Sequence, residues 1–186
     1  TNTGTDPNVA DSDGDGMDDG AEVLGTVEGL GLAGLGANPN RRTIFLEIDY
    51  TTAPRCDFED YQPATWEVET SEDMFAWAPV SNRDGSLGID LIIDDGRAAP
   101  LLGGNLLGSD DTLNDGLESE FLGYKASNLD PNRVGVFHYA IITHSQENGA
   151  GGLGEAPGDD FNVTQGCVDA SVARMATIVH ELGHNL

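Results

Sequence analysis

Runs of apolar residues along the chain predict four β-strands. Residues 43–50 (TIFLEIDY) and residues 88–94 (GIDLIID) are rich in β-branched and aromatic side chains, which favours strands. Residues 133–143 (RVGVFHYAIIT) are apolar at consecutive positions, so this strand is expected to be central and covered on both faces. Residues 159–164 (DDFNVT) predict a short strand whose acidic start favours the edge of a sheet.

Two further segments have the pattern of helices. Residues 62–78 carry large apolar side chains in a polar background and are followed by Pro79, which predicts a helix that ends there. A second helix is expected to begin near residues 167–169, with a buried stripe at helical spacing formed by Val168, Val172, Met175, Val179 and Leu182. Residues 95–132 predict a long loop with one helical turn. This order of elements indicates an α/β (α+β) fold, in which a mixed twisted sheet has an antiparallel edge strand and a backing helix.

The first forty residues differ in pattern from the rest of the chain. They contain no aromatic side chain, and their bulky apolar residues lie mainly in 22–36, so they cannot form a core alone. GTDPN at 4–8 recurs as GANPN at 36–40, and a glycine-rich linker lies between the two copies. We therefore expect a small appendage over residues 1–40 and a folded domain over residues 41–186.

Charge limits the partners of this chain. Its 8 basic and 33 acidic residues give a net charge of −25, which repels nucleic acid and anionic lipid and attracts cations. No apolar run is long enough to predict a membrane span. The acidity agrees either with a saline habitat or with an ordinary acidic surface. Cys56 and Cys167 can form a disulfide or remain free thiols, and the sequence leaves both possibilities open.

The segment DSDGDGMDDGAE, residues 11–22, matches a twelve-residue calcium-binding loop. Gly16 stands at the sharp turn of the loop, and the other matching positions carry oxygen ligands. These expected ligands are Asp11, Asp13, Asp15, Met17 through its backbone carbonyl, Asp19 and Glu22. The alternative is a solvated acidic run. Pro7 and Asn8 stand where an entering helix would lie, which favours a structural calcium clip over a calcium sensor.

The stretch TDPNVADSDGDGMDDGAEV resembles thrombospondin type 3 repeats and similar bacterial calcium repeats. The resemblance covers residues 4–40. It implies a calcium-stiffened spacer in a secreted or cell-surface protein of bacterial origin. By the same resemblance, Asp6 and Asn8 are expected to serve a neighbouring ion.

Residues 180–184, HELGH, place two histidines one helical turn apart on the same face of the last predicted helix. His180 and His184 can therefore direct ring nitrogens at one zinc ion. Glu181 is rotated away from His180 and can act as general base on a zinc-activated water. The alternative is a pair of surface histidines without a metal. For His138 and His144, which share one side of the strand 133–143 and its end, a structural role is favoured over a ligand role.

HELGHNL, residues 180–186, also resembles the start of the metzincin signature HExxHxxGxxH of reprolysin-like and pappalysin-like peptidases. The order of strands and helices over 43–186 is loosely similar. The resemblance implies a zincin-like fold with His180 and His184 as zinc ligands, Glu181 as catalytic base, and the strand 159–164 paired antiparallel with substrate. The family's third histidine would lie six residues beyond His184. We therefore expect this chain to be the upper part of a longer catalytic domain and inactive alone.

The function expected from these features is a secreted zinc endopeptidase that acts on peptides or proteins, with Zn²⁺ catalytic and Ca²⁺ structural. A thermolysin-like zincin, whose third ligand is a glutamate on a later helix, is the alternative enzyme. A calcium-dependent adhesion or binding module with a vestigial helix motif is the non-enzymatic alternative. Substrate preference and oligomeric state stay open.

Overall fold

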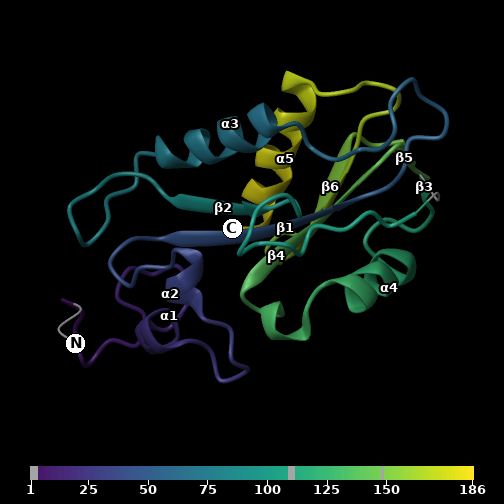
Figure 1. The fold of residues 1–186 in the computed structure, drawn as a ribbon. Helices are drawn as coiled ribbons and strands as arrows, with labels where there is room; N and C mark the ends of the chain where they lie inside the picture. The colour runs from purple at the N-terminus through teal and green to yellow at the C-terminus, as the bar shows by residue number, and fades with distance from the viewer. Residues whose placement is uncertain (1–3, 109–111, 148) are drawn as a thin grey trace. The chain divides into compact units, whose positions relative to one another are not determined.

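The computed structural model describes residues 4–108, 112–147 and 149–186. Two short helices come first in this part of the chain, and a run of four strands precedes the last helix (Figure 1). The elements are α1 (Asp19–Leu24), α2 (Leu32–Leu35), β1 (Thr43–Tyr50), α3 (Thr65–Ala76), β2 (Asp90–Asp94), β3 (Thr112–Leu113), α4 (Ser119–Asn128), the 3-10 helix η1 (Pro131–Arg133), β4 (Phe137–Thr143), β5 (Ser145–Gln146), β6 (Gly152–Gly154), β7 (Asp160–Thr164) and α5 (Val172–Asn185).

The chain divides into two compact units. The first unit contains the residues up to Phe45 together with Glu72–Ile92, and the second contains Leu46–Ser71 and Ile93–Leu186. The expected boundary at residue 40 does not coincide with this division. Since the N-terminal segment has few bulky apolar residues of its own, it packs against later ones: Gly36 lies so close to Ile92 that a Cβ there would be 2.9 Å from the Ile92 Cδ1.

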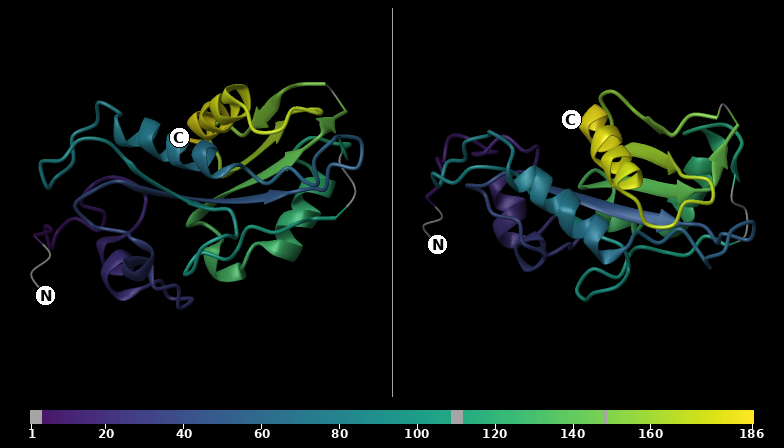
Figure 2. Two further views of the ribbon diagram at one scale, coloured as in Figure 1. Left: turned by 45° about the horizontal axis from the view of Figure 1, so that its top comes forward. Right: turned by 90° about the horizontal axis from the view of Figure 1, so that it is seen from above.

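The main sheet has five strands in the order β2-β1-β4-β7-β6, and the fold is mixed α/β with a mostly parallel sheet. β4 and β7 are parallel, with Ile141 opposite Asn162. β6 is antiparallel to β7, with Leu153 opposite Asn162. Helix α5 packs on β6 and β7 (Figure 2), whereas α4 lies on the other face of the sheet, where Phe121 packs edge to face on Tyr139 with ring centroids 5.5 Å apart. An antiparallel edge strand was expected and is present.

The identity of that edge strand differs from the expectation. The predicted strand over 159–164 corresponds to β7, which lies between β4 and β6 and is buried along its whole length. Its acidic first residue can be interior because Asp160 accepts a hydrogen bond from the Lys125 Nζ at 2.5 Å. The edge is formed instead by β6, a glycine-rich segment that the apolar pattern places in a loop.

The remaining predicted elements are largely confirmed. The predicted strand 43–50 has the same bounds as β1, and the segments predicted from 62, 88 and 133 contain α3, β2 and β4. β4 is buried at six of its seven positions, as its apolar pattern predicts. In the loop 95–132, α4 is a full helix of 10 residues rather than a single turn.

The buried stripe expected on the last helix is partly wrong. Val168 precedes α5 and is 48% exposed, and Val172 is 68% exposed. The buried face consists of Arg174, Met175, Ile178, Glu181, Leu182 and Asn185. Half of these residues are polar, and each has its own neighbour inside the protein. Arg174 bonds Glu67, Glu181 lies against β6, and Asn185 bonds the carbonyls of Glu155 and Asp160.

A disulfide joins Cys56 to Cys167 across a sequence separation of 111 residues. In the chain-entropy model a crosslink over a loop of this length stabilises the folded state by about 4–5 kcal/mol. It holds the segment that leads into α5, whose N-cap is Ser171. Among the described residues, every helix is too short or too polar to cross a bilayer.

Candidate metal centres

Helix α5 carries HELGH, and its first turn is held by polar contacts. The Ser171 Oγ accepts a hydrogen bond from the Arg174 backbone N–H at 3.0 Å, which caps the helix. Arg174 is 1% exposed, and its Nε donates to the Glu67 Oε1 at 2.9 Å; a second bond joins its Nη2 to Glu67 Oε2. The same Glu67 carboxylate accepts a bond from the Ser171 N–H. The start of α5 is therefore fixed to the first turn of α3.

His180 and His184 converge on the exposed side of α5. Their Nε2 atoms are 3.1 Å apart, and the rings are nearly perpendicular with centroids 4.6 Å apart. Two imidazole nitrogens on one tetrahedral zinc ion lie about 3.3 Å apart, so the pair fits a shared zinc. At this distance one ring can also donate a hydrogen bond to the other. Within the described ranges, no further His, Cys, Asp or Glu ligand atom joins them to form a group of three.

Glu181 lies against the edge strand. Its side chain is 6% exposed, and a Cβ added at Gly152 would lie 2.4 Å from the Glu181 Oε1. A Cβ at Gly154 would lie 3.2 Å from Oε2. An open cleft of about 490 Å³ is lined by Gly151, Gly152, Ala176, Thr177, His180 and Glu181. Glycine in β6 thus leaves the space in which the carboxylate sits beside His180.

The two other histidines have separate structural surroundings. The His138 Nδ1 lies 3.3 Å from the Asn185 Oδ1, and burial lowers the pKa of His138. The His144 Nδ1 lies 2.8 Å from the Tyr61 hydroxyl oxygen, beside the disulfide at Cys56. Neither histidine lies in a three-ligand group with the pair on α5 in the described part of the chain.

The loop over residues 11–22 gathers three carboxylates. Asp11, Asp13 and Asp15 bring one oxygen each to within 4.8 Å of one another. Gly14 and Gly16 have positive φ angles of 78° and 94°, which bend the chain around this group. Helix α1 follows the loop. The Asp15 Oδ2 accepts a hydrogen bond from the Thr43 N–H at 2.8 Å, which fixes the loop to the start of β1 within the first unit.

Glu22 and Asp13 carry buried oxygens that accept no hydrogen bond from the described residues. These atoms are both carboxylate oxygens of Glu22, which is 1% exposed, and Oδ2 of Asp13. Burial, together with the negative charge of Asp15 and its neighbours, raises the pKa of Glu22 to about 8. Burial and the same neighbours raise the pKa of Asp13 to about 6. Buried carboxylates of this kind need a cationic partner, and an all-oxygen donor set fits a hard cation such as Ca²⁺.

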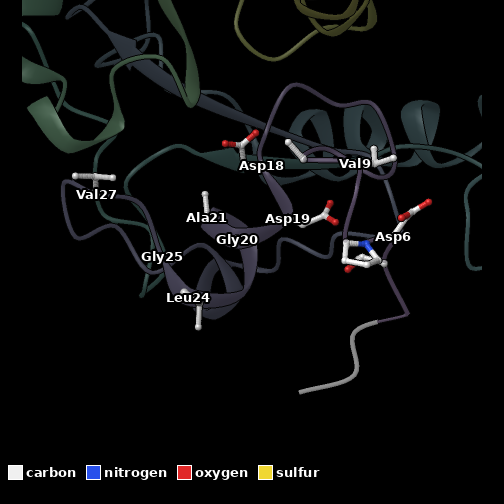
Figure 3. Close-up of a pocket in the computed structure, with 12 residues that line it drawn as sticks. Asp6, Val9, Asp18, Asp19, Gly20, Ala21, Leu24, Gly25 and Val27 are labelled. Carbon is white, nitrogen blue, oxygen red and sulfur yellow. The ribbon is translucent and has the colours of Figure 1, made fainter.

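The other expected calcium ligands have mixed surroundings. Met17 is buried at the inner side of the loop, and its N–H donates to Asp15 Oδ1 at 2.9 Å. The Asp19 carboxylate instead accepts two hydrogen bonds from Ser12 and lies outside the three-carboxylate group. Asp6 and Asn8 bond to each other through the Asp6 Oδ1. A cavity of about 510 Å³ beside the loop is lined by Asp6, Asp18 and Asp19 together with exposed apolar side chains (Figure 3).

Two further groups of potential ligands already have partners. Cys56 and Cys167 lie near His144, but their sulfur atoms are joined in the disulfide. Asp159 and Asp160 form a group with Glu155, and Lys125 supplies the positive charge there, with its Nζ 3.1 Å and 2.5 Å from the two aspartates. Neither group requires a metal ion.

A buried charge cluster on the α4 side of the sheet was not recognised from the sequence. Arg133 bonds both Glu47 and Asp94, and the Tyr139 hydroxyl donates to Asp49 Oδ2 at 2.5 Å. Burial raises the pKa of Glu47 to about 7 and that of Asp49 to about 6. The sequence pattern that indicates this cluster is the spacing of Glu47 and Asp49, which stand two positions apart in an otherwise apolar strand. This spacing puts both side chains on one face of the sheet.

The predicted metal ligands thus form two separate arrangements, the histidine pair on α5 and the carboxylate loop over residues 11–22. Function is inferred from their geometry and chemistry. Comparison of this chain with protein families, with curated proteins and with solved structures found no match.

Proposed function

We propose that this protein is a zinc-dependent endopeptidase of zincin type, in which His180 and His184 hold the metal. The observation that supports this most directly is the 3.1 Å separation of their Nε2 atoms, with His180 lining the same open cleft as Glu181. Catalytic zinc sites use three protein ligands. The proposal therefore requires a third ligand in addition to the two histidines that converge among the described residues.

The chain's own residues divide the catalytic work. Zinc, when bound, lowers the pKa of water and polarises the scissile carbonyl. Glu181 accepts the proton of the attacking water and delivers it to the leaving amine. Its surroundings suit this role because the carboxylate lines the cleft next to His180 and makes no hydrogen bond to any residue in the described ranges.

The open edge of β6 is the proposed substrate site, in place of the strand at 159–164. Thr164 N–H donates to the Gly151 carbonyl at 2.8 Å, and Glu155 N–H donates to the Asp160 carbonyl at 3.1 Å. Because bonded pairs alternate in an antiparallel ladder, Gly152 and Gly154 direct their backbone groups away from β7. On that open side the Gln146 Nε2 reaches the Gly152 carbonyl at 3.4 Å. An extended peptide can add there as an antiparallel strand.

Calcium is the second proposed metal, held by the loop over residues 11–22. The carboxylate ligands are Asp11, Asp13, Asp15 and Glu22, and Met17 supplies its backbone carbonyl. Asp19 lies at the edge of the site. The buried oxygens of Glu22 support this assignment because they accept no hydrogen bond from the residues that the structure describes. Calcium neutralises the carboxylates and stiffens the loop. The disulfide and the calcium loop together favour a secreted or cell-surface location.

Cleavage of a fluorescent protein substrate by the protein at its full encoded length tests the proposal. We expect zinc-dependent hydrolysis that a chelator abolishes and that Zn²⁺ restores. Glu181→Gln keeps the size of the side chain and is expected to lower the rate by at least about 100-fold, since it removes the general base. Activity that survives this substitution would contradict the assignment. Stoichiometric calcium without zinc in the purified protein would favour the adhesion module, and a glutamate as third ligand would favour the thermolysin-like alternative.

A further inference from the structure

The side chain of Asn185 joins the last turn of α5 to the connection between β6 and β7. Asn185 is 5% exposed and follows His184 directly. Its Nδ2 donates to the Glu155 carbonyl at 3.0 Å and to the Asp160 carbonyl at 3.1 Å. Its backbone carbonyl also accepts a bond from the Gly158 N–H at 3.3 Å. One residue therefore makes three contacts with this connection.

These contacts determine the orientation of the amide. Both carbonyls are acceptors, so the Asn185 NH₂ group must face them and its oxygen must face His138. The His138 Nδ1 lies 3.3 Å from that oxygen. His138 in its neutral form must therefore carry its proton on Nδ1 to satisfy the contact. The amide links α5, the β6–β7 connection and the central strand β4.

The two carbonyls belong to the residues that close the β6–β7 hairpin, because the Glu155 N–H donates to Asp160 O at 3.1 Å. Glu155 directly follows Gly154 of the edge strand. A Cβ at Gly154 would lie 3.4 Å from the His184 Cβ, so helix and strand are in close contact there. Asn185 thus controls the gap between His184 and the edge of the sheet.

In the last turn of α5, Leu182 is also fully buried, but the side-chain hydrogen bonds to the β6–β7 connection come from Asn185. Its flanking positions Gly183, His184 and Leu186 are exposed. The start of the helix is fixed separately by Ser171 and by the buried pair of Arg174 and Glu67. A helix terminus without side-chain contacts frays, because its final carbonyls have no partners within the helix. The orientation of His184 therefore depends on Asn185.

We propose that Asn185 is a positioning residue, whose amide orients His184 toward His180 and sets the spacing between α5 and the edge strand. This inference rests on the proposed function, since it concerns the same metal pair. Supporting groups around metal ligands typically change metal affinity by about 10–100-fold when they are removed. Removal of the Asn185 amide should therefore weaken metal binding by more than the loss of folding stability alone would.

Cobalt(II) binding to the 186-residue chain tests this proposal, with the visible absorption of the ion as readout and Ca²⁺ in excess to occupy the acidic loop. We expect Asn185→Ala and the bulkier Asn185→Leu to weaken cobalt binding by about 10–100-fold and to change the shape of the absorption bands. Ser171→Ala is the matched control: it removes the cap at the other end of α5 and is expected to lower the melting temperature but leave cobalt affinity unchanged.

A measurement on the metal-free chain provides a second readout. Long-range ¹H–¹⁵N NMR is expected to show the His138 proton on Nδ1 in the wild type and on Nε2 in Asn185→Ala. His138→Asn offers an amide donor close to the Nδ1 position and should retain wild-type cobalt binding, whereas His138→Leu should not. A structural role alone predicts no such difference between these two variants at equal stability.

The results separate the two proposals. If His180→Ala binds cobalt as tightly as the wild type, the proposed function is overturned and this inference with it. If cobalt binding depends on His180 but both Asn185 variants bind cobalt as tightly as the wild type, the positioning role alone is overturned. Loss of cobalt affinity in Ser171→Ala as large as that in Asn185→Ala would also overturn it, because general destabilisation would then explain both.

Discussion

The Arg174 Nε donates to the Glu67 Oε1 at 2.9 Å, and this pair joins α5 to the first turn of α3 over 107 positions of sequence. Both side chains are at most 1% exposed. A buried charge left without its partner costs about 3–5 kcal/mol. We expect Arg174→Met or Glu67→Gln alone to lower the free energy of unfolding by this amount. Urea denaturation of the oxidised chain measures it.

The double variant Glu67→Gln/Arg174→Met is the control for this pair. Because it removes both charges together, its free energy of unfolding should be higher than the sum of the two single effects predicts. It should be at least about as stable as either single variant. Strict additivity of the two single effects would show that the two side chains do not depend on each other.

Gly152 is expected to be essential for the position of Glu181. A Cβ there would lie 2.4 Å from the Glu181 Oε1, so Gly152→Ala must displace the carboxylate or the edge strand. We expect kcat for the proposed peptide hydrolysis, measured on the protein at its full encoded length, to fall at least about 10-fold, since small displacements of a catalytic group are costly. Gly123→Ala in α4 is the matched control, because a Cβ at Gly123 has no atom within 4 Å and Gly123 is not among the residues that line the cleft. Equal activity of the two variants would argue against a catalytic role of the Glu181 position.

The histidine pair is expected to bind zinc without completing a catalytic site in this 186-residue chain. Two nitrogens converge, and no third ligand atom joins them among the described residues. We expect zinc to be removed readily by a chromophoric chelator, and His180→Ala or His184→Ala to weaken binding by at least about 10-fold, since one of two ligands is lost. Peptide hydrolysis by this chain should be near background. Zinc that resists the chelator in either variant would indicate different ligands.

The loop over residues 11–22, the proposed calcium site, is expected to make stability depend on pH when calcium is absent. The pKa of Glu22 is raised to about 8 from its usual 4.5, so the folded state prefers the protonated carboxyl. Stability of the metal-free loop is therefore greatest below about pH 4.5 and falls as pH rises toward 8. Limited proteolysis between residues 4 and 40, at pH 5 and pH 8 with and without Ca²⁺, measures this. Calcium should abolish the difference.

Other buried acids, among them Glu47 and Asp49, shift in the same direction, so Glu22→Gln is the necessary comparison. This variant should lose most of the pH dependence in the loop and bind calcium more weakly. Calcium binding to the wild type at pH 7 should also release a proton, which calorimetry in two buffers of different ionisation enthalpy detects. No proton release would contradict the buried, protonated state of Glu22.

The sequence alone was sufficient for features whose causes are local. The strand at 43–50 follows from its content of β-branched and aromatic residues, and its bounds are those of β1. The convergence of His180 and His184 follows from helical periodicity, which brings positions four apart onto one face. The three aspartates of the loop gather because alternate residues of a tight turn point inward.

Tertiary structure decided the features that depend on distant partners. The apolar pattern could not identify β6 as the edge strand, because its glycines carry no side chains. Glycine is needed at these positions because the Glu181 side chain packs against them. Nor could it put Arg174 in the buried face of α5, since only the fold supplies Glu67. The same holds for the pairing of Cys56 with Cys167 and for Asp160 inside the sheet beside Lys125. In each case the position of a residue depends on a partner far away in sequence, and single-segment patterns contain no record of that partner.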